Sequence, residues 1–97
     1  MPKLDMESVQ DLVRAADIEG YIADGDPADE YDPEERQLFA AMSTWPSATF
    51  IKANVLAVII DIWRKSFSLD DADLSERLSK MDSLAAQFVH FFGEHND

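Results

Sequence analysis

The stretch ANVLAVIIDIW, residues 53–63, is the longest apolar run of the chain and decides its fold. Its β-branched residues are also typical of a strand. However, the run lies within residues 47–67, which contain no internal glycine or proline. Within that span, Asp61, Arg64 and Lys65 are set against the apolar Ile59, Ile62 and Trp63 as on opposite faces of a helix. A segment of this length and spacing favours a helix. The sequence therefore predicts a long, largely apolar central helix over about residues 47–67.

Three further helices are predicted around this one. Val9, Leu12, Val13 and Ala16 follow the i, i+3, i+4, i+7 spacing of one helix face and predict a helix over about residues 5–16. A second covers about residues 33–43, and the last covers about residues 70–92 with one continuous apolar stripe. No period-two alternation or hairpin signal is present. We expect an all-α fold in which residues 1–97 form a single domain, a compact bundle of about four helices with a short helical, acidic loop between the first two.

The most acidic segment is DIEGYIADGDPADEYDPEE, residues 17–35, which holds nine carboxylates and no lysine or arginine. The chain has a net charge of −12, and residues 1–35 hold twelve acids against two bases. Nucleic-acid affinity comes largely from basic side chains that displace counterions, and anionic membranes attract basic segments. We therefore expect no direct nucleic-acid binding and no membrane association. A basic protein is the partner that such a surface favours.

The start of the second helix carries a capping signal. Asp32 can act as the N-cap, Pro33 suits the first helical position, and Glu35 three residues on can complete a capping box. Ser68 and Asp71 offer the same pattern before the last helix.

The other carboxylates of the segment exceed what one cap needs, and like charges packed closely repel each other. We expect an exposed acidic loop that binds a basic partner, with aromatic anchors between the charges. The candidate partner-binding residues are Asp24, Asp26, Asp29, Glu30, Tyr31 and Tyr21. Two simpler interpretations stay open. The loop is only a solvated face, or Asp17 or Asp29 bonds nearby amides while Tyr31 packs on the bundle with its hydroxyl on a carboxylate.

A calcium loop is a further alternative. Counted from Asp24 as position one, Asp26, Asp32 and Glu35 fall at positions three, nine and twelve, but Asp29 stands at position six, where glycine is needed. The match is poor, so we expect no specific metal site and no cofactor. In another alternative the carboxylates imitate phosphates, and the protein acts as a DNA mimic or regulator.

Enzyme chemistry has little support in the sequence. The chain has no cysteine, and its two histidines, His90 and His95, have no serine partner at an informative spacing. We expect a non-enzymatic protein, and the lack of a signal peptide favours a cytoplasmic location. If Phe91 and Trp45 are exposed, they could form a homodimer patch.

Residues 17–39 resemble a motif of the YugE-like family of small, all-helical bacterial proteins of unknown function. That pattern reads approximately Asp-Pro-x-Gly-Leu, a short spacer, Gly-Ala-Pro-x-Asp-Glu-Tyr-Asp, a glutamate and an apolar helix. The matching residues are Asp17, Gly20, Gly25, Pro27, Asp29, Glu30, Tyr31, Asp32 and Glu35, followed by Leu38 and Phe39. Ile18, Tyr21 and Asp26 depart from it. The resemblance implies a small helical fold, and it suggests an immunity-protein role for relatives that lie beside toxin genes.

Overall fold

The computed structural model describes residues 4–93, apart from the side chains of Ala28 and Asp29. Its helices are α1 (Met6–Ala16), α2 (Asp32–Met42), α3 (Lys52–Phe67) and α4 (Asp71–Phe92), with short 3-10 turns η1 (Ala28–Tyr31) and η2 (Ser47–Thr49). No strand occurs in residues 4–93, so the predicted all-α bundle is confirmed. Within the same residues, no helix combines the length and apolar character needed to cross a membrane.

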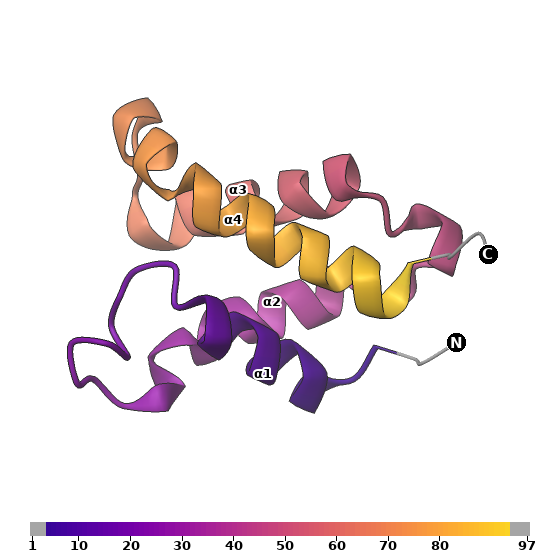
Figure 1. Cartoon of the computed structure of the whole chain (residues 1–97), viewed down its shortest axis with the longest axis horizontal. Coiled ribbons are helices and arrows are strands. Elements are labelled where there is room, and N and C mark those ends of the chain that lie inside the picture. The colour runs from indigo at the N-terminus through magenta and orange to yellow at the C-terminus, as the bar shows by residue number, and fades with distance from the viewer. Residues whose placement is uncertain (1–3, 94–97) are drawn as a thin grey trace.

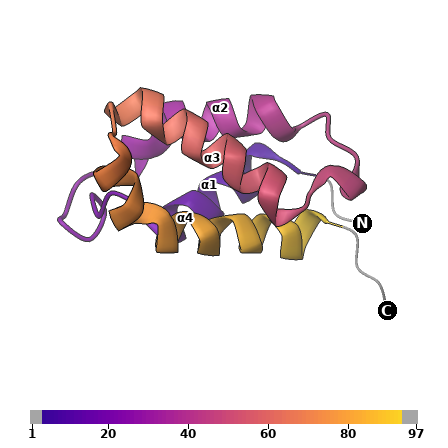
Figure 2. The ribbon, with the colours of Figure 1, turned by 90° about the horizontal axis from the view of Figure 1, so that it is seen from above.

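Successive helices run antiparallel, and each packs mainly on its neighbours in the order α1, α2, α3, α4 and back to α1 (Figure 1). The loop that follows α1 lies at one end of the bundle, while the start of α1 and the end of α4 lie at the other (Figure 2). The largest fully buried side chains are those of Trp63, Tyr31, Phe88, Leu38 and Met42. With Val9 and Val13 of α1, which are also fully buried, the core receives residues from all four helices and from the acidic segment.

The central helix begins five residues later than the sequence predicts. Residues 47–49 form the separate turn η2, Ile51 is extended, and α3 starts at Lys52. The carbonyl of Thr49 accepts hydrogen bonds from the Ile51 amide at 2.8 Å and from Asn54 Nδ2 at 3.0 Å. This turn satisfies the backbone locally and lets Phe50 enter the core, which a continuous helix from residue 47 would not do.

Both predicted capping boxes are wrong. At α4 the box is formed by Asp70 and Asp73, because Ser68 adopts the left-handed conformation that ends α3. At α2 the N-cap position is Tyr31, without a side-chain cap, and Asp32 is the first helical residue. Pro33 is the second helical residue, one position later than predicted. The carboxylates of Asp32 and Glu35 are instead engaged by Arg14, as described below.

Candidate functional site: the acidic segment

Asp17 connects α1 to the acidic loop. It adopts a left-handed backbone conformation (φ 43°) at the end of α1. Its Oδ1 accepts hydrogen bonds from the Tyr31 hydroxyl at 2.7 Å and the Ile22 amide at 3.1 Å, and its Oδ2 accepts one from the Ala23 amide at 3.0 Å. Burial alone would raise the pKa of Asp17, but these three hydrogen bonds outweigh it and lower the pKa. The expectation that Asp17 bonds nearby amides is confirmed.

Tyr31 is a core residue. Its side chain is fully buried, its ring stacks on Tyr21 with centroids 5.7 Å apart, and it lies 6.2 Å from the Trp63 ring. Its hydroxyl donates to Asp17 and accepts from the Glu19 amide at 3.0 Å. Burial, reinforced by the Asp17 carboxylate, raises the pKa of Tyr31. The prediction that Tyr31 contacts a partner is therefore wrong, because the ring fills the core between α1 and α3.

Arg14 neutralises two carboxylates of α2. Its Nε lies 3.3 Å from Glu35 Oε2, and its Nη2 lies 3.3 Å from Asp32 Oδ1. The Glu35 side chain is fully buried, whereas those of Arg14 and Asp32 are about one-third exposed, at 32% and 33%. Burial raises the pKa of Glu35; Arg14 opposes this effect and the neighbouring Asp32 adds to it. These residues form an internal ion-pair network.

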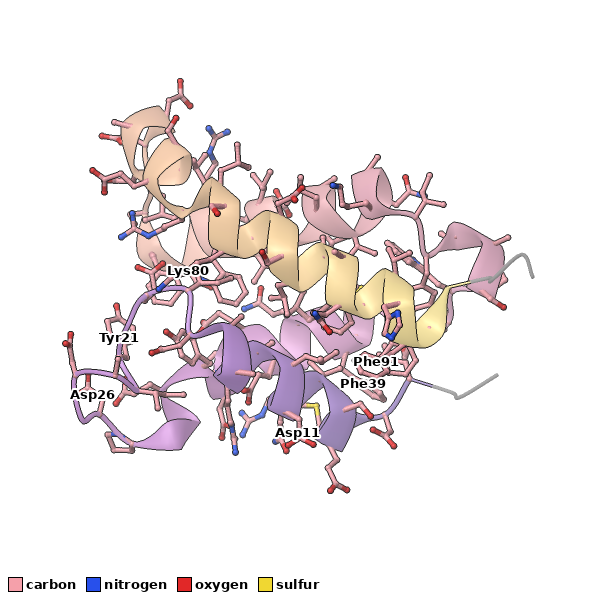
Figure 3. All side chains as sticks on the ribbon, in the orientation of Figure 1. Asp11, Tyr21, Asp26, Phe39, Lys80 and Phe91 are labelled. Atoms are coloured by element: carbon pink, nitrogen blue, oxygen red, sulfur yellow. The ribbon has the colours of Figure 1, made fainter. Side chains whose placement is uncertain are left out.

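A second network ties the loop to α4. Arg77 Nε lies 2.7 Å from Glu19 Oε2, and the Glu19 side chain is only 4% exposed. Lys80 Nζ donates to the Asp17 carbonyl at 3.2 Å. Lys80 and the loop lie beside each other in Figure 3. Sequence reasoning missed these contacts because they join residues 58 and 63 positions apart.

Glu34 is also buried, in the first turn of α2, with 5% of its surface exposed. Burial raises its pKa, and a hydrogen bond with Ser66 opposes the shift. The sequence offers one signal that carboxylates of this segment contact distant parts of the chain. Residues 4–35 contain a single base, Arg14, so carboxylates that fold inward need bases from elsewhere in the chain.

The remaining described carboxylates form what we call the acidic tip, which consists of Asp24, Asp26 and Glu30. All three are exposed, and none forms an ion pair within the part of the chain that the structure describes. Asp26 lies at the outer end of the loop, away from the bundle (Figure 3). Asp29 was also predicted to bind a partner, but its side chain lies outside the described residues.

The backbone of the tip is held in a tight turn. Gly25 has a φ of 94°, which favours glycine, and the Asp26 amide donates to the Tyr21 carbonyl at 2.9 Å. Tyr21 lies half-buried beneath the tip, between Tyr31 and the Phe67 ring at 6.0 Å. Burial raises the pKa of Tyr21, and the charges of Glu19, Glu30 and Asp26 raise it further, whereas Arg77 opposes the shift. Tyr21 is therefore the only one of the two predicted aromatic anchors that a partner could reach.

The two other sites considered from the sequence are the calcium loop and the homodimer patch of Phe91 and Trp45. Among the described residues, no group of three or more potential ligands could hold a metal ion. Asp32 and Glu35, two of the four possible calcium ligands, face Arg14 instead. In the proposed homodimer patch, Phe91 is 46% exposed, but Trp45 is half-buried and packs edge-on against Phe50. His95 lies outside the described residues.

No protein-family model, no curated protein and no solved structure matches the chain. The resemblance to the YugE-like family therefore stays a hypothesis based on its motif. Several residues that carry the motif, namely Asp17, Tyr31, Asp32 and Glu35, form the internal contacts described above. In this chain these four residues therefore help to hold the segment in place.

Proposed function

We propose that this is a non-enzymatic, cytoplasmic binding protein whose acidic tip engages a basic partner protein. An immunity-type inhibitor of a toxin is the role that we favour. The observation that carries the proposal is the contrast within one segment. Asp24, Asp26 and Glu30 are exposed and have no ion-pair partner in the described residues, whereas Asp32, Glu35 and Glu19 are each matched by an arginine.

The loop is braced before any partner arrives. The Asp17–Tyr31 hydrogen bond holds the end of the loop next to the bundle, and Arg77 and Lys80 attach the loop to α4. Backbone hydrogen bonds hold the turn at Gly25. A surface that is already ordered loses less conformational entropy on binding. Its uncompensated negative charge would attract basic side chains and accelerate association at low salt. Tyr21 at the edge of the tip supplies aromatic area for the contact.

A toxin nuclease is one partner of this chemistry, because an enzyme that binds nucleic acid carries basic side chains in and around its cleft, and an inhibitor can bind those outside it. The immunity role suggested by the YugE-like motif agrees with this choice. The second candidate function is a DNA mimic, in which the tip carboxylates occupy the phosphate sites of a nucleic-acid-binding protein. The two functions differ in what nucleic acid does to the complex.

The test is an affinity capture from native lysate at low and moderate salt with three paired baits. The first is the wild type, and the second is the tip-neutral variant Asp24→Asn, Asp26→Asn, Glu30→Gln. The third is a charge-matched control that neutralises exposed carboxylates away from the tip, namely Glu7→Gln, Asp61→Asn and Glu76→Gln.

We expect a basic protein to bind the wild type and the control, to be lost from the tip-neutral variant, and to weaken as salt increases. Equal capture by all three baits would contradict the proposal. Duplex DNA added to the purified complex then separates the two functions, because a DNA mimic must be displaced by competition at the same site. An inhibitor that binds outside the cleft stays bound.

A further inference from the structure

The groove between α1 and α4 contains two consecutive cavities. One has a volume of about 240 Å³ and is lined by residues that include Asp11 and Phe91. The other, of about 370 Å³, is lined by residues that include Ala15 and Gln87. Leu12 lines both, so the cavities adjoin along one groove, which we call the α1–α4 groove. It lies on a different part of the surface from the acidic tip, and none of the tip residues lines it.

An aromatic side chain is exposed at this groove. Phe91 is 46% exposed although it belongs to the last turns of α4, and its ring contacts those of Phe92 and His90. Exposed apolar residues that occur singly are ordinary on protein surfaces. Here the exposed ring borders a cavity with Leu12 beside it, so an apolar side chain inserted there would bury both.

The charge beside the first cavity is negative, whereas Lys80 of α4 lies one turn before Leu84 of the second cavity. Asp11 lines the first cavity, and Glu7, one turn earlier on α1, is exposed. Among the described residues, no lysine or arginine lines either cavity. Figure 3 labels Asp11 on α1 and Phe91 on α4. The complementary ligand is therefore apolar on the side that enters the groove and cationic beside the first cavity.

The spacing of the cavities fits a helix. Along α1, the first cavity centres near residues 8–12 and the second near residues 12–16. A shift of four residues corresponds to about 6 Å along the axis of α1. Along α4, the first cavity lies at residues 91–92 and the second at residues 83–87, a shift of about seven residues or roughly 10 Å. Apolar side chains one or two turns apart on a ligand helix, at i and i+4 or at i and i+7, match this range. An extended peptide would find no sheet edge here to satisfy its backbone groups.

We propose that the α1–α4 groove binds a cationic amphipathic helix of a partner protein. Two apolar side chains one or two turns apart occupy the cavities, the first against Phe91 and Leu12. Lysine or arginine on the flank of the ligand helix faces Asp11. This surface is independent of the acidic tip, so the proposal stands or falls separately from the function proposed above.

The probe is a synthetic helical peptide with leucines at i, i+4 and i+7 and lysines on the flanking positions. Its affinity is measured by calorimetry, and its site is located by NMR shifts of the Leu12 and Leu84 methyl groups. We expect Phe91→Ser to weaken binding by at least about tenfold. The matched control is Leu78→Ser, which removes an equally exposed apolar residue (46%) of α4 that lines neither cavity.

Ala15→Glu separates groove binding from charge attraction. Ala15 is exposed on α1 and lines the second cavity, so glutamate is compatible with the helix but fills the space that the second leucine needs. Groove binding predicts a weaker complex, whereas attraction by charge alone predicts a tighter one. The tip-neutral variant should bind the peptide at the same groove, with the same methyl shifts.

Four results would overturn the proposal. The first two are equal affinity of Phe91→Ser and Leu78→Ser, and tighter binding by Ala15→Glu. The third is equal affinity for a peptide of the same composition whose leucines are scattered around the helix. The fourth is a dimer in analytical ultracentrifugation that Phe91→Ser dissociates, because the groove would then be occupied by a second copy of the chain.

Discussion

Two sets of carboxylates from one short segment have opposite surroundings in this protein. The first set, which we call the inner carboxylates, consists of Asp17, Glu19, Asp32, Glu34 and Glu35. These side chains are mostly or partly enclosed and bond arginine, tyrosine, serine or backbone amides. The acidic tip is exposed and has no ion pair in the described residues. The amino-acid composition does not distinguish the two sets of carboxylates. Burial in the folded protein determines which of them the fold needs.

The difference follows from the free energy of desolvation. A carboxylate that leaves water loses several kcal/mol of hydration, so it must gain a cation or several hydrogen bonds. Arg14 and Arg77 fill that need for Glu35 and Glu19. Carboxylates at the tip keep their water and need no partner. The inner carboxylates should therefore control stability, and the acidic tip should control binding.

The largest effect is expected from Arg14→Met, which leaves Glu35 buried without a cation. Loss of one partner of a buried ion pair costs roughly 3–5 kcal/mol, and we expect about 3 kcal/mol here because Arg14 is partly exposed. Urea denaturation at neutral pH measures the change. The matched control is Arg36→Met, because Arg36 is 72% exposed and its contact with Asp32 is long, at 3.7 Å. This variant should lose no more than about 0.5 kcal/mol of stability.

A double variant sharpens this test. Combining Arg14→Met with Glu35→Leu removes the unpaired charge and replaces the pair by apolar side chains, which in other proteins is often neutral or stabilising. Most of the lost stability should return. If the Arg14→Met variant alone has the same urea midpoint as the wild type, the inner carboxylates do not hold the fold as described.

The next effect is expected from Tyr31→Phe, which removes only the hydroxyl that joins Asp17 to the Glu19 amide. The ring still fills its place, but a buried acceptor and donor lose their partner, at a cost of about 1–2 kcal/mol. Amide hydrogen exchange at Ile22 and Ala23 should accelerate because Asp17 is held less firmly. Tyr21→Phe is the control, and exchange that accelerates equally in both variants would contradict the role of the Tyr31 hydroxyl.

The sequence predicts much of this fold and less of its polar interior. Helical spacing identifies four helices, because apolar periodicity directly reflects which face is buried. Turn residues locate the ends less well, as at Lys52, where a local turn interrupts the expected helix. The partnership of Glu19 with Arg77 lies beyond local spacing, since only tertiary packing brings them together. Asp32 and Glu35 have the correct types for a capping box, but Arg14 competes for both carboxylates.

A smaller, pH-dependent effect is expected from Glu34→Gln. Burial raises the pKa of Glu34 above its ordinary value of 4.5, so near that pH the folded protein binds the proton more tightly than the unfolded chain. This contribution to stability is fully present below pH 4.5 and is lost as the pH rises through the folded pKa. Glutamine stays neutral throughout. The variant should therefore lose less stability than the wild type between about pH 4.5 and pH 7.5.

Urea midpoints across that range measure the difference. Glu30→Gln, at the exposed tip, is the control and should follow the wild-type pH dependence. The range stays above the region where Asp17 matters, because a lowered pKa gives stability that is lost only as the pH falls below 3.8. Parallel curves for the wild type and Glu34→Gln would show that the carboxylate of Glu34 is solvated in the folded protein.

The smallest effect on stability is expected at the tip. Neutralising Asp24, Asp26 and Glu30 together removes three exposed charges from a chain of net charge −12, so the repulsion within the folded state decreases. The free energy of unfolding should stay within about 0.5 kcal/mol of the wild type or rise slightly. Because the same variant is expected to lose its basic partner, stability and binding would separate within one loop. A loss of stability comparable to that of Tyr31→Phe would instead place the tip among the structural carboxylates, and the partner would have to bind elsewhere on the bundle.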